Sequence, residues 1–222
     1  MCINYRPLND RTRKNTYPLP RIDECVNNID KGQKFTKLDI VAGYWQLQLK
    51  NEDIPKTAFN TKDGKFEFLI MPFGLTNAPA TFQAIMNSIL RPCLSFMEVY
   101  LDDIVIYSDS EEEHEKHVEM VLQLLQDNGL YASPEKCVSG TDVVVFCGHE
   151  IGNGRVRPLR EKAALITSWP RPKTVRHVRQ FVGFASYYRT YLKGFAKTAT
   201  PLFELLKESD ATQRKNKHQA IQ

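Results

Sequence analysis

The chain has 222 residues, of which 42% are hydrophobic and 25% charged, and its formal net charge is +4. These proportions are ordinary for a globular protein with a sizeable core. No apolar run approaches the roughly 20 residues of a membrane-spanning helix, and no basic and then apolar signal opens the chain, so we expect an intracellular protein without a membrane partner.

The first part of the chain is expected to form one helix and two strands. Residues 1–20 are rich in turn formers and end in a Tyr-Pro-Leu-Pro run that breaks any helix. Apolar residues recur at helical spacing over 22–29 and alternate over 35–41, which predicts a helix and then a strand with Asp39 near its end. A second short strand is predicted over 46–49.

A hairpin and a helix are predicted next. Residues 57–59 and 65–70 favour strands, and the Asp-Gly pair within 60–64 supplies the positive φ of a tight turn. A loop over 71–79, which contains Pro and Gly, then leads into a helix. One face of that helix carries apolar residues: Phe82, Ile85, Met86 and Ile89.

The aspartate hairpin, residues 97–107, places two charges between apolar runs. Asp102 and Asp103 lie between segments that favour burial in strands, so both carboxylates are expected at the tip of a tight hairpin. Adjacent carboxylates repel each other and resist burial unless a cation compensates them. Aspartate oxygens suit Mg²⁺ or Mn²⁺. The alternative is an Asp-Asp turn that faces water.

A helix is predicted after the aspartate hairpin. Ser110 and Glu113 have the spacing of a capping box, and Gly129 is expected to end the helix. His114 and His117 lie one turn apart in a very polar run, which favours a solvated helix face over a metal site. The five cysteines form no Cys-x-x-Cys pair, which argues against a disulfide framework or a zinc ribbon.

Strands end and basic residues gather in the last third. Strands are predicted over 143–146 and around 150–151, and no strand pattern follows Pro158. Between Arg155 and Lys193 there are ten basic residues and one acidic residue, a local charge of +9. This block indicates either a polyanion partner or a solvated helical face. The expected later segments are helices over 160–168, 175–192 and 201–206 and a polar, frayed tail over 207–222.

Three carboxylates are candidates for one site. Asp39 and the pair Asp102 and Asp103 occur in strand contexts, and a strand end and a hairpin tip can converge in an antiparallel sheet. Such a cluster could hold two divalent ions about 3.5–4 Å apart, activate a 3′-hydroxyl and stabilise a leaving pyrophosphate. Together with the basic block, it indicates nucleotidyl transfer on nucleic acid.

The Tyr-Leu-Asp-Asp run at 100–103 resembles the Tyr-x-Asp-Asp box of retroelement reverse transcriptases, above all those of gypsy-type (metavirus) long-terminal-repeat retrotransposons. Further motifs follow that family's order: NYRPLN (4–9), YPLPRI (17–22), KLD (37–39), GY (43–44), MPFGL (71–75), APATFQ (78–83) and YYR (187–189). The resemblance implies an α+β right-hand polymerase with truncated fingers. It also implies partial fingers and palm over 1–157, the start of a helical thumb over 158–206 and a polar tail over 207–222.

The resemblance implies a role for each matching residue. Asp39, Asp102 and Asp103 match the catalytic carboxylates that bind two Mg²⁺ or Mn²⁺ ions. Tyr44 matches the aromatic residue that excludes a 2′-hydroxyl. Other implied contacts to the incoming deoxynucleotide involve Phe73, Gly74 and Gln83. Contacts to the primer or template are implied for Phe146, Cys147, Gly148, His149, Arg171, Lys173, Arg176 and Arg179.

Two functions remain open. The chain is either the core of an RNA-directed DNA polymerase that extends a primer on an RNA or DNA template, or a catalytically incomplete remnant that binds nucleic acid. Lys136 either assists the leaving group or is a solvated lysine. We expect a piece of a Pol polyprotein, with ribonuclease H and integrase domains as partners, in the cytoplasm within a virus-like particle or in the nucleus, or else a degraded copy of such an element.

Overall fold

The structure is a computed structural model, and it describes residues 3–219 of the chain. The chain forms two compact units, Met1–Val156 and Arg157–Gln222. The predicted boundary between palm and thumb, after residue 157, lies one residue from this division. Within the described range, no helix combines the length and the apolar character that crossing a membrane requires.

Helices and strands alternate in the first unit, whereas the second contains helices after its first residues. The helices are α1 (Arg6–Arg11), α2 (Ile22–Ile29), α3 (Ala78–Ile89), α4 (Glu111–Asp127), α5 (Arg160–Thr167), α6 (Val175–Tyr187) and α7 (Phe195–Gln219). The 3₁₀ helices are η1 (Gly43–Gln46), η2 (Ile54–Thr57), η3 (Arg91–Cys93) and η4 (Arg189–Tyr191). The strands are β1 (Lys34–Asp39), β2 (Phe59–Thr61), β3 (Gly64–Phe66), β4 (Met97–Tyr100), β5 (Asp103–Ser108), β6 (Val138–Thr141), β7 (Val143–Phe146), β8 (His149–Gly152) and β9 (Arg155–Pro158).

An antiparallel sheet with the strand order β4-β5-β1-β6 forms the centre of the first unit. β1 and β5 pair over their whole length, from Lys34 opposite Ser108 to Asp39 opposite Asp103. β4 and β5 form the predicted aspartate hairpin, so its tip lies beside the end of β1. The structure thereby confirms the expected α+β architecture of an antiparallel sheet backed by helices.

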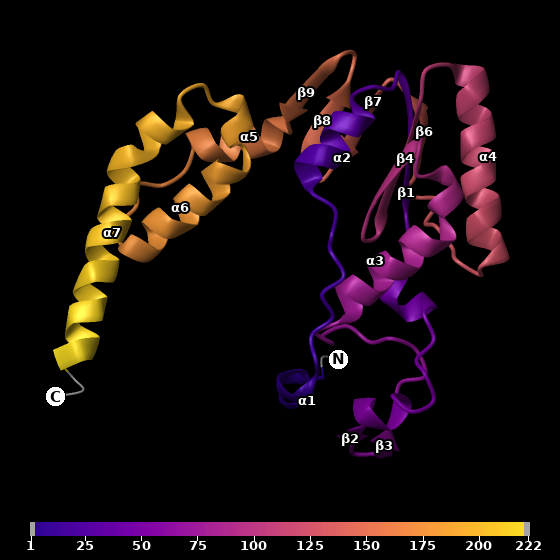
Figure 1. Ribbon diagram of the computed structural model, residues 1–222, viewed down its shortest axis with the longest axis horizontal. Coiled ribbons are helices and arrows are strands. Elements are labelled where there is room, and N and C mark those ends of the chain that lie inside the picture. Colours follow the sequence, from indigo (N-terminus) through magenta and orange to yellow (C-terminus); the bar gives the residue numbers. More distant parts are fainter. Residues whose placement is uncertain (1–2, 220–222) are drawn as a thin grey trace. The chain divides into compact units, whose positions relative to one another are not determined.

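Helices lie on both sides of this sheet (Figure 1). Apolar side chains cover both of its faces, because successive residues of a strand point to opposite faces. On one face, Leu38 of β1 and Ile104 of β5 pack with α3 and α4 in the larger core. On the other face, Phe35 and Val105 pack with α2, β7 and β8 in a second core. Because both faces are covered, the hairpin tip is held from two sides.

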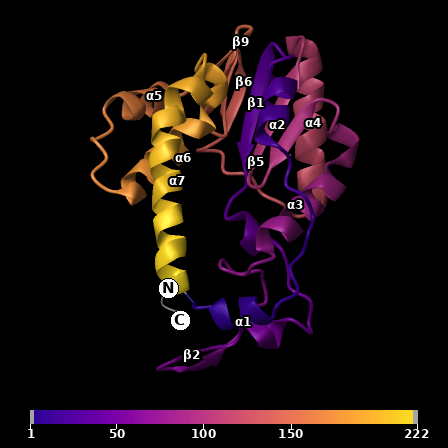
Figure 2. The same cartoon turned by 60° about the vertical axis from the view of Figure 1, so that its left-hand side comes forward.

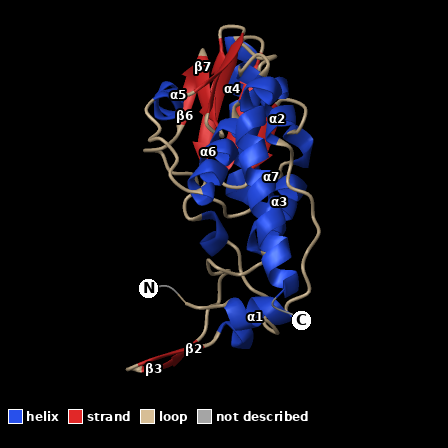
Figure 3. Ribbon diagram, turned by 90° about the vertical axis from the view of Figure 1, so that its left-hand side faces the viewer, coloured by secondary structure: helices blue, strands red, loops and turns tan. Residues whose placement is uncertain are grey.

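β2 and β3 form the hairpin that the Asp-Gly pair predicts, and this hairpin is separate from the central sheet (Figure 3). Its strands are shorter than expected and meet around residues 62–63. The strand predicted over 46–49 is wrong. Residues 43–46 form η1, and only an isolated bridge joins Gln48 to Ile70. The alternation is too short to sustain a ladder beside Pro72, which cannot donate a backbone hydrogen bond.

The second unit is helical, and α6 and α7 run side by side within it (Figures 1 and 2). Trp169 stacks on Phe184 with ring centroids 5.3 Å apart, and Val178 and Val182 are buried. The predicted helix over 175–192 ends earlier, at Tyr187, because a 3₁₀ turn of weaker helix formers, η4, follows. In place of a short helix and a tail, α7 begins at Phe195 and continues to Gln219, with Pro201 inside it.

Besides the 3₁₀ helices η2 and η3, one helix and two strands have no counterpart in the sequence-based expectations. α1 begins with Pro7 in its first turn, where proline is tolerated, although the segment reads as turn-prone. β6 and β9 are strands of four residues each, a length that gives a sequence pattern little room to appear. The four cysteines in the described range form no disulfide bond with one another, and the fifth, Cys2, lies outside it.

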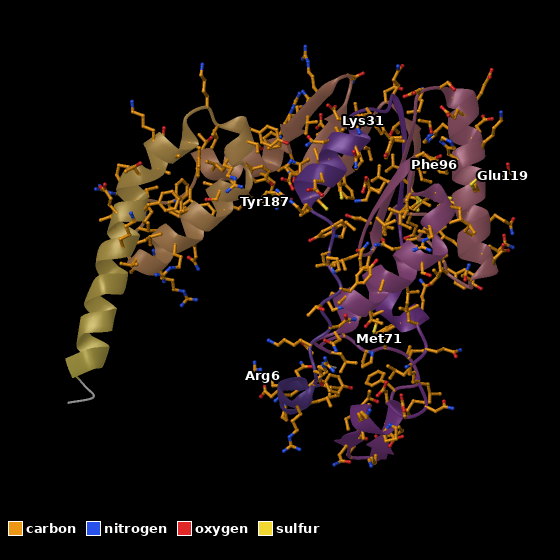
Figure 4. The ribbon with its side chains drawn as sticks, viewed as in Figure 1. Arg6, Lys31, Met71, Phe96, Glu119 and Tyr187 are labelled. Carbon is orange, nitrogen blue, oxygen red and sulfur yellow. The ribbon has the colours of Figure 1, made fainter. Side chains whose placement is uncertain are left out.

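His114 on α4 is buried, so the prediction of a solvated face is wrong for this residue. Its two ring nitrogens form hydrogen bonds to Ser108 Oγ, at 2.9 Å, and Thr36 Oγ1, at 2.7 Å. Ser108 Oγ also meets His117 Nδ1 at 2.8 Å, and the His117 ring stacks on Phe96. Figure 4 shows Phe96 between the sheet and α4, and Glu119 on the outward side of that helix. The hydroxyl partners satisfy the imidazole and make its burial tolerable.

Acid is expected to destabilise the protein through this histidine. Burial, with smaller effects of His117 and Lys34, lowers the pKa of His114 from its ordinary value of about 6.5. The unfolded chain then binds more protons than the folded one, so the free energy of unfolding falls as the pH drops below about 6.5. Urea unfolding at about pH 7.5 and pH 5.5 should show a smaller fall for His114→Gln than for the unmodified protein. Equal falls would assign the effect to other groups.

Candidate active site

The aspartate hairpin has a two-residue turn, Leu101 and Asp102, and Asp103 is the first residue of β5. Leu101 has a φ of 53°, while Asp102 is not in the left-handed region. A positive φ at the first central residue alone is the pattern of a type II′ turn, which glycine usually fills. A branched side chain in this conformation stores strain, so other parts of the structure must hold the turn.

Gln83 of α3 holds the strained turn. Its amide oxygen accepts a hydrogen bond from Leu101 N at 2.8 Å, and its Nε2 donates to the carbonyl of Val99 at 2.9 Å. The side chain is fully buried. The structure therefore places Gln83 beneath the aspartate hairpin as a support of its turn, and the substrate contact that the resemblance implies stays a prediction.

The three predicted carboxylates, Asp39, Asp102 and Asp103, come together at the end of the sheet, and we call them the carboxylate cluster. Asp39 and Asp103 are direct partners in the β1–β5 register. Asp102 is fixed by its carbonyl, which accepts a hydrogen bond from Ile40 N at 3.1 Å. Asp39 thus meets two aspartates that are 63 and 64 positions away in the sequence.

The Asp102 carboxylate is the least compensated member of the carboxylate cluster. Its Oδ1 is buried and has no hydrogen-bond partner. Burial raises the pKa of Asp102, and the charges of Asp39 and Asp103 raise it further, whereas Lys136 opposes them. An ionised oxygen in this position lacks the cation or donors that a buried charge requires.

Gly43 makes room for this carboxylate. A Cβ on Gly43 would collide with Asp102 Oδ1 and would lie only 2.8 Å from Cζ of Phe82. Gly43 is itself buried at the start of η1, directly before Tyr44. Glycine at position 43 of the Gly-Tyr pair is therefore required because no Cβ fits beside Asp102, a reason that the sequence pattern alone does not reveal.

Two lysines compensate the other two carboxylates. Lys37 Nζ lies 2.9 Å from Asp103 Oδ1, and Lys136 Nζ lies 3.2 Å from Asp39 Oδ1. Lys136 is thus at the cluster, where sequence reasoning left its role open. Lys37 was missed as a site residue, and only its place two residues before Asp39 in a strand, which puts both on one face, could have indicated it.

Aromatic side chains border the carboxylate cluster. The ring of Tyr44 lies 5.2 Å from that of Phe73 and 5.5 Å from that of Phe82. Burial, and then the charge of Asp102, raise the pKa of Tyr44. Phe73 is exposed and also contacts Trp45 at 5.7 Å, and the adjacent Gly74 is exposed with a φ of 96°. The structure therefore groups Tyr44 and Phe73 beside Asp102.

The β7–β8 hairpin holds the four predicted primer-contact residues, but in different surroundings. Phe146 is fully buried in the second core, and His149 is 7% exposed, with its pKa lowered by burial. The turn between them, Cys147 and Gly148, is partly exposed, and both residues have positive φ. Of these four residues, Phe146 and His149 are buried, and Cys147 and Gly148 are the two that are partly exposed.

The basic residues predicted to contact nucleic acid belong to the second unit. Arg171 and Lys173 precede α6, and Arg176 and Arg179 lie on it. All four side chains are exposed, while Val178 and Val182 of the same helix are buried. The exposed face of this segment is therefore strongly basic.

The carboxylate cluster has donors that suit a hard divalent cation. Its oxygen ligands match the preference of Mg²⁺ and Mn²⁺, and the unpartnered Oδ1 of Asp102 is the kind of buried charge that an ion would compensate. As placed among the described residues, no three side chains of the His, Cys, Asp and Glu types surround one point as a complete metal site. In this structure, Asp103 forms an ion pair with Lys37, and Asp39 forms one with Lys136.

Sequence comparison identifies relatives of the chain. Residues 1–151 match the family described as reverse transcriptase (RNA-dependent DNA polymerase). The chain is 41% identical over 209 residues to the retrovirus-related Pol polyprotein from transposon 297 of Drosophila melanogaster, covering 94% of the chain and 20% of that protein. It is 36% identical over all 222 residues to the corresponding polyprotein from transposon gypsy of the same species, of which it covers 21%. The Tf2-3 transposon polyprotein of Schizosaccharomyces pombe is 37% identical to the chain over 209 residues. The matched region covers 94% of the chain and 16% of that polyprotein.

Solved structures with a similar fold are reverse transcriptases of foamy virus. The protease-reverse transcriptase in complex with an RNA/DNA hybrid matches with a TM-score of 0.81 and 22% identity, over 92% of this chain and 28% of that one. Its complex with double-stranded DNA matches with a TM-score of 0.86 and 22% identity. This match covers 94% of the present chain and 44% of the foamy virus chain. The chain thus spans about a fifth of the polyproteins it matches and has a polymerase fold. It belongs to the reverse transcriptase (RNA-dependent DNA polymerase) family and resembles the Pol polyproteins of gypsy and related retrotransposons.

Proposed function

We propose that this chain is the polymerase core of a retrotransposon Pol polyprotein and adds deoxynucleotides to a primer 3′-hydroxyl on an RNA or DNA template. The observation that carries the proposal is the carboxylate cluster, in which Asp39 pairs with Asp103 and the adjacent Asp102 has a buried, unpartnered oxygen. Asp39, Asp102 and Asp103 are the residues that would hold Mg²⁺ or Mn²⁺. Two such ions, when bound, would lower the cost of deprotonating the 3′-hydroxyl and of releasing pyrophosphate.

The surroundings of the cluster suit a nucleotide. Tyr44 and Phe73 offer aromatic faces beside Asp102, against which a sugar or base can pack. Exclusion of a 2′-hydroxyl by Tyr44 is part of the proposal. Phe73 offers no polar contact, so the incoming nucleotide would rely there on apolar packing and on the backbone of Gly74.

Nucleic acid is the proposed macromolecular partner. Two of the similar foamy virus structures are complexes, one with an RNA/DNA hybrid and one with double-stranded DNA. The exposed Arg171, Lys173, Arg176 and Arg179 would neutralise phosphates, which makes binding dependent on salt. The turn of Cys147 and Gly148 is the proposed primer contact on the first unit. Ribonuclease H and integrase domains are proposed for the parent polyprotein, of which this chain would be one part, and the second unit is proposed as the start of a thumb.

Primer extension tests this proposal. The chain is incubated with an RNA template, a DNA primer, deoxynucleotides and Mg²⁺ or Mn²⁺, beside an Asp102→Asn, Asp103→Asn variant and an Asp109→Asn control. Asp109 is an exposed carboxylate at the far end of β5. The proposal expects extension by the chain and the control and none by the double variant. Template binding without extension by any of them would contradict it and favour a nucleic-acid-binding remnant.

A further inference from the structure

The strand β6 forms an open edge of the central sheet. It is the last strand in the order β4-β5-β1-β6, so within the described residues no strand pairs with the side of β6 that faces away from β1. Val138, Ser139 and Gly140 of this strand are exposed. At the opposite edge of the sheet, by contrast, Met97 and Val99 of β4 are buried, and α2 and α3 pack on that strand. An exposed edge is a place where an extended peptide can add a strand.

A groove lies between this edge and the helix α4, and we call it the α4–β6 groove. Its volume is about 460 Å³, and Ser139 and Gly140 border it on the strand side. On the helix side it is bordered by Val118 and by Leu122, which is 44% exposed. Figure 1 shows α4 alongside the central sheet, where it packs on β5 and β1. Exposed apolar side chains with polar residues around them are typical of a protein interaction site.

The helix side of the α4–β6 groove is acidic. Glu111, Glu115 and Glu119 border it at intervals of about one helical turn. Two of these carboxylates, Glu115 and Glu119, have no cationic partner among the side chains that the structure describes. Lys34 also borders the groove, but Asp142 engages its ammonium at 2.9 Å. A ligand with positive charges would therefore compensate the open carboxylates.

The spacing of the three glutamates fits an extended chain. Residues four apart on a helix are separated by about 6 Å along its axis. Side chains on one face of a strand recur about every 6.6 Å. Alternate lysine or arginine side chains of an extended peptide can thus follow the glutamates in turn. Their methylene stems can lie along Val118 and Leu122, because long basic side chains cover apolar surface while the charge stays in water.

We propose that the α4–β6 groove binds an extended segment of another protein that carries lysine or arginine at alternate positions and adds a strand to β6. Nucleic acid is disfavoured, because its phosphates would meet the glutamates. A second copy of the chain is disfavoured as well, since pairing of two β6 edges would bring two acidic surfaces together. The groove includes Lys34, at the end of β1 opposite Asp39, so this binding does not depend on the carboxylate cluster or on the proposed function.

Fluorescence anisotropy with the full chain tests this proposal. The probe is a labelled hexapeptide of alternating lysine and threonine, and its control has the same composition with the three lysines adjacent. The alternating peptide should bind at least about tenfold more tightly than the control, because only its lysines match the spacing of the glutamates. A hexapeptide of alternating glutamate and threonine should not bind.

Substitution of the groove carboxylates gives the matched comparison. Glu115→Gln combined with Glu119→Gln should weaken binding of the alternating peptide by about five- to tenfold and should make binding less dependent on salt. Glu52→Gln combined with Glu112→Gln removes the same charge from exposed positions that do not border the groove, and it should leave the affinity unchanged. Asp102→Asn should also leave it unchanged, which shows that the peptide does not bind at the carboxylate cluster. Circular dichroism checks that each variant folds.

Methylation of the peptide backbone tests whether a strand is added. Alternate residues of a strand direct both their N–H and their C=O groups to the same neighbouring strand. N-methylation of one set, either the lysines or the threonines, should therefore abolish binding. N-methylation of the other set should change the affinity by less than about threefold, because those N–H groups face away from β6.

Several results would overturn the proposal. Equal affinity for the alternating peptide and its control would show an unspecific attraction to negative charge, and no binding of either would leave the groove without this ligand. Undiminished binding of both methylated peptides would show that no strand is added to β6. An affinity unchanged by Glu115→Gln with Glu119→Gln would place the peptide elsewhere on the chain. None of these measurements involves metal or primer, so the proposed polymerase function would stand in each case.

Discussion

Replacing Asp102 with asparagine is expected to stabilise the metal-free protein and to abolish its primer extension. The carboxylate has a buried oxygen without a partner, and burial together with Asp39 and Asp103 raises its pKa. A raised carboxyl pKa means that the ionised form costs folding free energy at neutral pH. The neutral amide removes that cost, and about 1 kcal/mol would raise the melting temperature by about 2–4 °C. Extension should fall by more than about a hundredfold, because a ligand is lost.

Thermal unfolding with and without Mg²⁺ or Mn²⁺ measures the first effect, and primer extension measures the second. The ion should raise the melting temperature of the unmodified chain by mass action but not that of Asp102→Asn. The exposed Asp109→Asn variant should behave like the unmodified chain in both measurements. An Asp102→Asn variant that melts lower without metal, or that still gains stability from the ion, would argue against an uncompensated carboxylate at this position.

Replacing Gly43 with alanine is expected to displace the Asp102 side chain from its position in the carboxylate cluster. The new Cβ would collide with Asp102 Oδ1 and would lie 2.8 Å from the Phe82 ring. Phe82 is fully buried in the larger core, so the Asp102 side chain must give way or the core must shift. Overpacking of this kind costs about 1–3 kcal/mol. Gly43→Ala should therefore lower the melting temperature and remove both metal-dependent stabilisation and extension.

Gly183→Ala on α6 is the matched control for this substitution. A Cβ on Gly183 meets no heavy atom within 4 Å. Alanine in a helix is favoured over glycine, so this variant should gain about 0.5–1 kcal/mol and keep its activity. Gly43 is not held at a positive φ, and backbone strain should not contribute. If Gly43→Ala responds to metal as the unmodified chain does, the Asp102 carboxylate does not occupy the space that the structure assigns to it.

Local patterns in the sequence were sufficient for the main elements of the first unit. The capping box predicted the start of α4, where the Ser110 hydroxyl accepts from Glu113 N, and the apolar face containing Phe82 and Met86 predicted α3. Where the sequence pattern was short or mixed, the predicted element was wrong. The alternation over 46–49 produced only a single bridge, since a strand requires a partner that accepts its register. α7 likewise extends well beyond the predicted short helix.

The candidate site was predicted in part. Residue types and spacing led to the expectation that Asp39, Asp102 and Asp103 converge, and the β1–β5 register brings them together. Their catalytic role and those of Tyr44 and Phe73 stay predictions. The motif match could not distinguish residues that face a substrate from those that support the site. Phe146 packs in a core and Gln83 holds the hairpin turn, although both lie within family motifs.

By itself, the sequence determined the family, the α+β class and the presence of a carboxylate pair on a hairpin, because these follow from residue identity, period and local spacing. Only the tertiary structure decided which charges compensate one another. Lys37 with Asp103, Lys136 with Asp39 and the buried His114 with Thr36 are contacts between segments 66, 97 and 78 positions apart. Such pairs depend on strand register and on the packing of α4, which bring together residues that no local pattern relates.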